Sequence, residues 1–284
     1  MTTMQNKKVS VIVPNYNYAR YLEKRIDSIL KQTYPIYELI ILDDASSDES
    51  VKKLESIILK LKSKFPKLKI KFLRNEKNSG KTILQWRKGV EEANGDYIWI
   101  AEADDLSRRD FLKTAMEGFS DPKVVLSYVE SAVISGRGII IAPNFRWSRD
   151  KEKTGHYKNS YIKNGMDEIR EILAIRCTIP NVSAVVFKND KKLLKYLDEA
   201  ARFSQVGDWY FYIKILENGK ISYNRRPLNL FRVHKKSATK QAEKIIHLNE
   251  IKKIHKLIND EYEISENIKQ RMVNEEERIK NERI

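Results

Sequence analysis

The chain has 284 residues, of which 41% are hydrophobic and 10% aromatic. This is enough for one large α/β core with an appended subdomain, or for two modest domains. The single cysteine, Cys177, excludes an internal disulfide and argues against a thiolate metal site. The N-terminus has no signal-peptide pattern, and no apolar run approaches the roughly 20 residues of a membrane span. We therefore expect a protein of the reducing cytoplasm.

The net charge of +15 predicts contact with an anion such as a nucleic acid, a membrane surface or a phosphorylated substrate. Residues 52–88 contain thirteen Lys or Arg and two acidic residues, whereas residues 240–284 contain ten of each sign. Two interpretations of the basic stretch 52–88 remain open. It forms a solvated surface that keeps the protein soluble, or it rests on anionic lipid head groups at the inner face of the membrane.

The first third of the chain alternates short β-rich runs with helical patterns, which is typical of βαβ units and a parallel sheet. The predicted strands are Val9–Val13, Glu38–Leu42, Leu68–Leu73 and Tyr97–Ala101. The predicted helices are Tyr18–Lys31, a helix that runs to about Lys64 after a capping box of Ser46 and Glu49, and Lys81–Ala93 with Asn94-Gly95 as its C-cap.

The rest of the chain is less regular. The patterns predict a helix at Arg109–Phe119, strands at Val124–Val133 and Val182–Phe187, a helix at Trp209–Glu217, and strands at Lys220–Asn224 and Leu228–Val233. Residues 135–161 have no clear period, and we interpret 137–161 as a candidate lid. From Lys240 onward, Ile and Leu at helical spacing predict a charged helix or helical hairpin.

Three acidic residues, Glu102, Asp104 and Asp105, directly follow the apolar strand that starts at Tyr97. Alternate side chains of a strand point to the same side, so Glu102 and Asp104 can converge on one point. Hard divalent cations prefer such oxygen ligands. The alternative is a strand end with solvated acids and Asp105 as a helix N-cap.

Polar clusters follow the other predicted strands as well. They are Pro14-Asn15-Tyr16-Asn17, Asp43-Asp44-Ala45-Ser46 and Asn78-Ser79-Gly80. Because ligands of open parallel sheets bind at the carboxyl ends of the strands, we expect these clusters and the acidic one to share one rim.

In sequence these segments read VSVIVPNYN, QTY, DDASSD, NSG and GDYI, the last leading into EADD, over residues 9–105. This ordered set resembles the family 2 glycosyltransferases of the GT-A fold. The likeness extends less tightly to Ile179-Pro180-Asn181, Gly207-Asp208-Trp209 and Arg232-Val233-His234. It implies an α/β fold with a Rossmann-like, mostly parallel sheet flanked by helices. Residues 1–105 would bind the donor, and 106–239 would bind the acceptor and carry catalysis. Residues 240–284 lie beyond the resemblance, and their helical spacing predicts a charged C-terminal extension.

The resemblance also implies roles for individual residues. A nucleotide-sugar donor would be bound by Pro14, Tyr16, Asp44, Asn78, Glu102 and Arg232. Asp44 can accept the ring N–H of uracil or thymine, and Tyr16 can stack on the base; taken singly, Asp44 could equally be a turn residue and Tyr16 a packing residue.

A metal ion is implied at the same place. Mn²⁺ or Mg²⁺ would be held by Asp104 and His234, where it stabilises the departing diphosphate. Glu102 stands where the family usually has Asp, so we expect it to bind ribose rather than metal.

Asp208 is the candidate general base, because an inverting transfer needs one carboxylate to take the proton of the acceptor hydroxyl. The chain reads Val206-Gly207-Asp208 where the family more often has Glu-Asp, and a helix N-cap is the alternative role. Trp209 could stack on an acceptor sugar or act as a buried anchor. A usual Ala-Arg-Asn triplet is replaced by Leu84-Gln85-Trp86. Lys81 or Arg87 could supply the missing donor-facing charge, or both could equally be solvated residues of the basic stretch.

The sequence therefore predicts an inverting, metal-dependent glycosyltransferase of cell-surface polysaccharide synthesis. It would use a nucleoside diphosphate sugar, with a UDP-sugar favoured, and a glycan or lipid-linked acceptor. A sugar nucleotidyltransferase would instead have a Gly-rich basic loop after the first strand. A non-catalytic protein that binds membrane or nucleic acid would explain the charge but not the aligned acids, which repel phosphates unless a cation intervenes; we expect no nucleic-acid partner.

Overall fold

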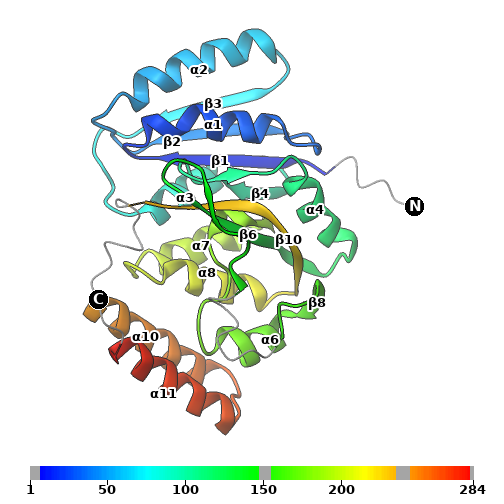
Figure 1. Cartoon of the computed structure of the whole chain (residues 1–284), viewed down its shortest axis with the longest axis vertical. Helices are drawn as coiled ribbons and strands as arrows, with labels where there is room; N and C mark the ends of the chain where they lie inside the picture. Colours follow the sequence, from blue (N-terminus) through cyan, green and yellow to red (C-terminus); the bar gives the residue numbers. More distant parts are fainter. Residues whose placement is uncertain (1–6, 147–154, 235–243, 282–284) are drawn as a thin grey trace.

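A computed structural model of the chain describes residues 7–146, 155–234 and 244–281. Its centre is one ten-stranded sheet of order β3-β2-β1-β4-β9-β6-β10-β5, with β7 paired to β6 and β8 paired to β10 (Figure 1). The strands are β1 (Val9–Asn15), β2 (Glu38–Asp43), β3 (Lys69–Arg74), β4 (Tyr97–Ile100), β5 (Leu106–Ser107), β6 (Val124–Ser135), β7 (Ile140–Ala142), β8 (Tyr161–Asn164), β9 (Val185–Lys188) and β10 (Lys220–Val233).

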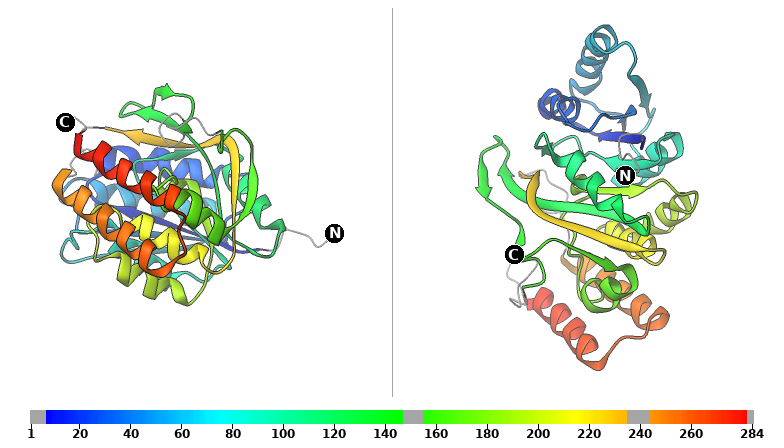
Figure 2. Two further views of the ribbon diagram at one scale, coloured as in Figure 1. Left: turned by 90° about the horizontal axis from the view of Figure 1, so that it is seen from below. Right: turned by 90° about the vertical axis from the view of Figure 1, so that its right-hand side faces the viewer.

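Helices cover both faces of this sheet (Figures 1 and 2). They are α1 (Ala19–Leu30), α2 (Ser50–Lys64), α3 (Thr82–Glu92), α4 (Phe111–Glu117), α6 (Gly165–Glu168), α7 (Lys192–Ala200), α8 (Gly207–Leu216), α10 (Lys244–Glu261) and α11 (Glu266–Asn281). One apolar core joins α1, α2 and α4 to the sheet, and the other joins α3, α7, α8, α10 and α11 to its opposite face. None of the described helices is long and apolar enough to cross a membrane.

Strand alternation explains this division. In β1, Val9, Val11 and Val13 belong to the core under α1, whereas Ile12 belongs to the core under α3. β3, β2, β1 and β4 are parallel, as the alternating strands and helices predicted. The second half joins through β9, which lies antiparallel between β4 and β6. The expected α/β fold with a helical C-terminal hairpin is confirmed.

Several local predictions were wrong. β10 is one long strand with bulges around Pro227 rather than two strands, and β7 forms within the stretch that showed no period. The helix α7 was missed. Part of the candidate lid, residues 147–154, lies outside the described residues.

The capping box is absent because other groups use its serine. α2 begins at Ser50 without a side-chain cap. The Ser46 hydroxyl instead donates to Asp43 Oδ2 at 2.7 Å and accepts from Asn15 Nδ2 at 3.1 Å. The loop after β2 is therefore tied to the end of β1 rather than to the helix.

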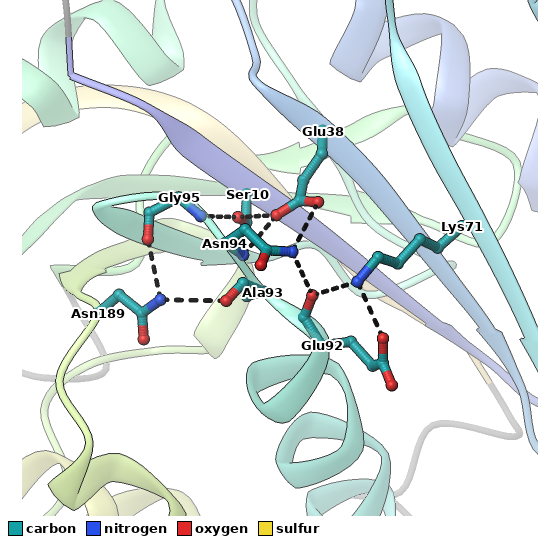
Figure 3. Close-up of polar contacts among 8 residues, drawn as sticks. All are labelled: Ser10, Glu38, Lys71, Glu92, Ala93, Asn94, Gly95 and Asn189. Carbon is teal, nitrogen blue, oxygen red and sulfur yellow. Dashed lines mark hydrogen bonds and ion pairs between the residues drawn. The ribbon is translucent and has the colours of Figure 1, made fainter.

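Gly95 is required by close packing and not by a helix cap, since α3 ends before it with Ala93 as the C-cap residue. It lies at the amino ends of β1, β2 and β4, where the Ser10 hydroxyl accepts from its N–H at 2.8 Å and donates to Glu38 at 2.6 Å (Figure 3). A Cβ on Gly95 would lie 2.7 Å from the Ser10 backbone nitrogen. Only glycine allows this approach without moving a strand.

We therefore expect Gly95→Ala to lower the free energy of unfolding by about 2 kcal/mol, because overpacking against backbone cannot relax by a rotamer change. Urea denaturation measures this value. Gly136→Ala is the control, since its added Cβ would meet nothing nearer than 3.4 Å. Equal destabilisation by the two substitutions would contradict the packing argument.

Candidate active site

The acidic end of β4 is held by donors from distant parts of the chain. The Glu102 carboxylate accepts a hydrogen bond from Trp86 Nε1 on α3 at 2.6 Å, and its backbone N–H donates to Ser183 Oγ at 3.1 Å. Desolvation, reinforced by the charge of Asp104, raises the pKa of Glu102 to about 8. Glu102 therefore favours its protonated form at neutral pH when no cation is bound.

Asp105 is buried and is not a helix cap, because α4 starts only at Phe111. Its carboxylate accepts from Asn181 Nδ2 at 2.5 Å and from the Arg232 backbone N–H at 2.8 Å. Asn181 is itself fixed by Asn229 at 3.0 Å. Burial raises the pKa of Asp105 to about 7. This residue links the end of β4 to β10 and to the segment before β9.

Asp104 and His234, the two predicted metal ligands, are brought together by the fold. Asp104 Oδ2 lies 3.0 Å from His234 Nε2, and the imidazole packs against the rings of Tyr18 and Tyr21 at 5.5 and 5.6 Å. The Arg232 Nε donates to the Asp104 carbonyl, and its guanidinium lies 4.5 Å from the Tyr21 ring centre. Arg232 thus supports the metal-binding candidates rather than pointing away from the protein.

The spacing of this pair suits a cation. Two ligands about 2.1 Å from a metal and at right angles to each other lie about 3 Å apart, and an oxygen with an imidazole nitrogen suits Mn²⁺. The described residues contain no group of three or more His, Cys, Asp or Glu side chains placed to hold a metal. Asp104 and His234 would therefore need oxygens of a bound diphosphate or water to complete the coordination.

The sequence reasoning missed Arg25. It is fully buried on α1, donates to Ser107 Oγ at 2.9 Å and lies 5.2 Å from the Trp99 ring centre. Burial lowers its pKa to about 10, opposed by the charges of the three acids at the end of β4. The sequence does contain a sign of this role, because Arg25 is a charged residue within the apolar stripe of the predicted helix.

The predicted base-binding residue Asp44 has its own hydrogen bonds. Its carboxylate accepts from Asn75 Nδ2 at 2.6 Å, from Gln85 Nε2 at 2.9 Å, and from the backbone and hydroxyl of Ser79 at 2.9 and 2.7 Å. Asn78 donates to the Asp44 carbonyl at 3.1 Å. Asp44 and Asn78 thus shape the loop between β3 and α3.

The other two predicted donor residues, Pro14 and Tyr16, lie at the carboxyl end of β1. Pro14 is buried within the strand, whereas Tyr16 is 46% exposed just beyond it. The loops that follow β1 and β2 contain strained backbone, with φ of 58° at both Asn17 and Ala45. Such conformations persist only where surrounding contacts enforce them and are frequent at binding sites.

The N-terminal half of α3 connects the separate acidic positions. Gln85 binds Asp44, and Trp86 binds Glu102. One turn earlier, Ile83 meets Gly207, whose added Cβ would lie 3.0 Å from Ile83 Cδ1. Gln85 and Trp86 of the replaced triplet therefore tie the loop after β2 and the end of β4 to α3, and the neighbouring Ile83 adds a contact with the start of α8.

Asp208 lies in the first turn of α8, partly buried, with its carboxylate accepting the Trp209 N–H at 2.8 Å. Burial raises the pKa of Asp208 to about 6. Trp209 is a buried anchor and not a sugar platform, because it is 2% exposed and donates to the Leu173 carbonyl at 2.9 Å. Lys81 and Arg87 also have protein partners, the Ala201 carbonyl and Asp198.

A cavity of about 640 Å³ opens beside His234. It is lined by Asn17, Tyr18, Ala19, Arg20, Asp48, Glu49, Gly136 and His234. This places open space next to the Asp104–His234 pair, bordered by the N-terminus of α1.

The structure therefore places polar residues at the carboxyl ends of β1, β2 and β4, and it brings the Asp104 carboxylate into contact with the His234 imidazole. The profile of the family described as "Glycosyl transferase family 2" matches residues 10–178. The chain belongs to this family.

Curated relatives align with part of the chain. An uncharacterised glycosyltransferase of Nostoc sp. is 36% identical over 119 residues, which are 42% of this chain and 34% of the relative. A putative teichuronic acid biosynthesis glycosyltransferase of Bacillus subtilis is 29% identical over 46% of this chain and 49% of its own length. The chain thus spans between a third and a half of these two relatives.

Solved structures show the same fold over almost the whole chain. Staphylococcus aureus TarS in complex with UDP-GlcNAc superposes with a TM-score of 0.68 at 20% identity, covering 94% of this chain and 72% of that one. A mannosyltransferase of Pyrobaculum calidifontis in complex with GDP-Man and Mn²⁺ has a TM-score of 0.61 at 19% identity, covering 96% and 70%.

We expect Asn181→Ala to lower the free energy of unfolding by about 1–3 kcal/mol, because it removes a donor from the buried Asp105 carboxylate. Chemical denaturation measures the loss. Asn159→Ala, at an exposed position, is the control. A change for Asn181→Ala no larger than that of the control would show that Asp105 does not depend on this bond.

Proposed function

We propose that the protein is an inverting, metal-dependent glycosyltransferase that moves a sugar from a nucleoside diphosphate donor to a glycan or lipid-linked acceptor. The observation that carries the proposal is the convergence of Asp104 with His234 at one end of the sheet, next to an open cavity. Family membership and the donor complexes of TarS and the mannosyltransferase support it.

In this proposal residues 1–105 bind the donor. Tyr16 is exposed at the end of β1 and can stack on the base. Asp44 Oδ1 accepts three hydrogen bonds, whereas Oδ2 accepts one, from the Ser79 hydroxyl, so the ring N–H of the base would bind at Oδ2. Glu102, held by Trp86 through one oxygen, keeps its second oxygen for a ribose hydroxyl.

Asp104 and His234 would hold Mn²⁺ or Mg²⁺, which supplies Lewis-acid stabilisation of the leaving diphosphate. Asp208 takes the proton of the acceptor hydroxyl while the new bond forms at the anomeric carbon. The bond from that carbon to the diphosphate breaks, and its electron pair leaves with the diphosphate. Attack opposite the leaving group inverts the anomeric configuration.

The setting we propose is cell-surface polysaccharide synthesis in the cytoplasm, because named relatives include a teichuronic acid glycosyltransferase and a poly(ribitol-phosphate) N-acetylglucosaminyltransferase. A UDP-sugar is the favoured donor, since the TarS structures contain UDP or UDP-GlcNAc. The basic stretch 52–88, which spans α2, β3 and most of α3, supplies a surface for peripheral contact with anionic lipid at the inner membrane face.

The test is a panel of UDP-GlcNAc, UDP-glucose and GDP-mannose, assayed for hydrolysis with Mn²⁺ and with EDTA.

We expect Asp208→Asn to lower turnover by about 10²–10⁴-fold and to leave UDP affinity unchanged, because the base does not contact the nucleotide. Isothermal titration with UDP and Mn²⁺ measures the affinity. Turnover that persists in EDTA, or in Asp208→Asn, would reject the assigned chemistry, and UDP binding without turnover of any sugar would favour a non-catalytic anion-binding protein.

The pH profile provides a second test. A base must be ionised to accept a proton, and burial places the pKa of Asp208 at about 6. Turnover should therefore fall about tenfold per pH unit below pH 6 and level off above pH 7. A stopped assay from pH 4.5 to 8.5 checks this, with UDP affinity measured at each pH as the control. A profile that is flat through pH 6 would exclude Asp208 as the titrating group.

A further inference from the structure

The C-terminal hairpin α10–α11 packs directly on the segment that carries Asp208. It lies next to α8 in each view (Figures 1 and 2). Ile251, Ile254 and Ile258 of α10 belong to the same core as Trp209 and Phe211 of α8. The hairpin therefore shares the packing of the helix on which the candidate base sits.

The hairpin also contributes a buried carboxylate to this segment. Glu250 is 6% exposed, and its two oxygens accept from the backbone N–H groups of Ser204 at 2.7 Å and Gln205 at 2.8 Å. Hydrogen bonds to an ionised carboxylate are stronger than neutral ones. Ser204 and Gln205 immediately precede Val206, the N-cap residue of α8, so Glu250 fixes the chain where it enters the first turn that contains Asp208.

A second contact fixes the residue after Asp208. The His255 ring of α10 packs edge-on against the Trp209 indole, with ring centres 5.8 Å apart. His255 Nε2 lies 3.1 Å from the Ile175 carbonyl, and Nδ1 lies 2.7 Å from Glu276 of α11. Because Trp209 also donates to the Leu173 carbonyl, the hairpin and residues 173–175 together enclose it.

We propose that the hairpin is a positioning element of the catalytic site and that Glu250 is the positioning residue for Asp208. This inference rests on the proposed function. A general base must lie within hydrogen-bond reach of the acceptor hydroxyl, and a displacement of about 1 Å can lower turnover about a hundredfold. Loss of the Glu250 hydrogen bonds would free the backbone at residues 204–205. The orientation of the Asp208 side chain, three residues further on, would then no longer be fixed.

The first experiment measures the local effect without a substrate. Hydrogen exchange of the full chain is compared for wild type, Glu250→Ala and the control Glu263→Ala, which changes an exposed glutamate between α10 and α11. In Glu250→Ala, peptides covering residues 201–212 should exchange at least about tenfold faster, with peptides covering 95–107 unchanged. Uniform acceleration of all peptides, or none, would overturn the local role of Glu250.

The second experiment asks whether Glu250 acts through Asp208. With the nucleotide sugar of the panel that wild type hydrolyses fastest, Glu250→Ala should lower kcat about 10–100-fold, while UDP affinity with Mn²⁺ stays unchanged. Glu250→Gln, which keeps the size and one acceptor oxygen, should lie between Glu250→Ala and wild type. In the Asp208→Asn background, Glu250→Ala should cause no further loss.

The outcomes separate the two proposals. Equal losses in both backgrounds, or an intact kcat in Glu250→Ala when Asp208→Asn has lost turnover, would overturn the positioning role and leave the proposed function standing. Full turnover by Asp208→Asn would overturn the role of Asp208 and the inference built on it.

Discussion

Three carboxylates within four residues at the end of one buried strand impose the main constraint on this structure. Burial and the charge of Asp104 raise the pKa of both Glu102 and Asp105, so these acids need compensating groups. These groups come from remote segments: Arg25 on α1, Trp86 on α3, Asn181 before β9, and Arg232 and His234 at the end of β10. The acidic end of β4 is thus the point where both halves of the sheet have to meet.

The three acids differ in how readily they can exchange their present hydrogen-bond partners for a ligand. Asp105 is buried with donors from two segments, so exchanging one of them would release the end of β4 from β10 or from the segment before β9. Glu102 has one indole partner on one oxygen. Asp104, whose side chain is 16% exposed, pairs with an imidazole that can bind the same cation. Asp105 therefore has a structural role, whereas Glu102 and Asp104 can exchange partners, and the buried Arg25 supplies positive charge near all three acids.

The N-terminal half could be predicted from sequence because its information is local. Short apolar runs and helical stripes place β1 to β4 and α1 to α3 to within a few residues, and the rule that strand ends share a rim brings Asp104 to the expected edge. The predictions failed where a side chain is used by a distant partner. Ser46 was assigned to a capping box but serves Asp43 and Asn15. Asn94-Gly95 was assigned to a helix end, whereas Gly95 is fixed by contact with Ser10 across the sheet.

Contacts with distant partners also explain why the role of residues 240–284 could not be predicted. Ten charges of each sign over this stretch are typical of a solvated helix, and nothing in the spacing distinguishes Glu250 from Glu263. In the structure Glu250, His255 and Glu275 are buried, and Glu275 reaches Arg176 at 3.1 Å. Because a buried polar or charged side chain is tolerated only when it is hydrogen-bonded or paired, each of these residues marks a point where the hairpin is joined to the body. Two of those points, at residues 204–205 and at Trp209, flank Asp208, and these two contacts are the reason for the positioning role that we propose for the hairpin.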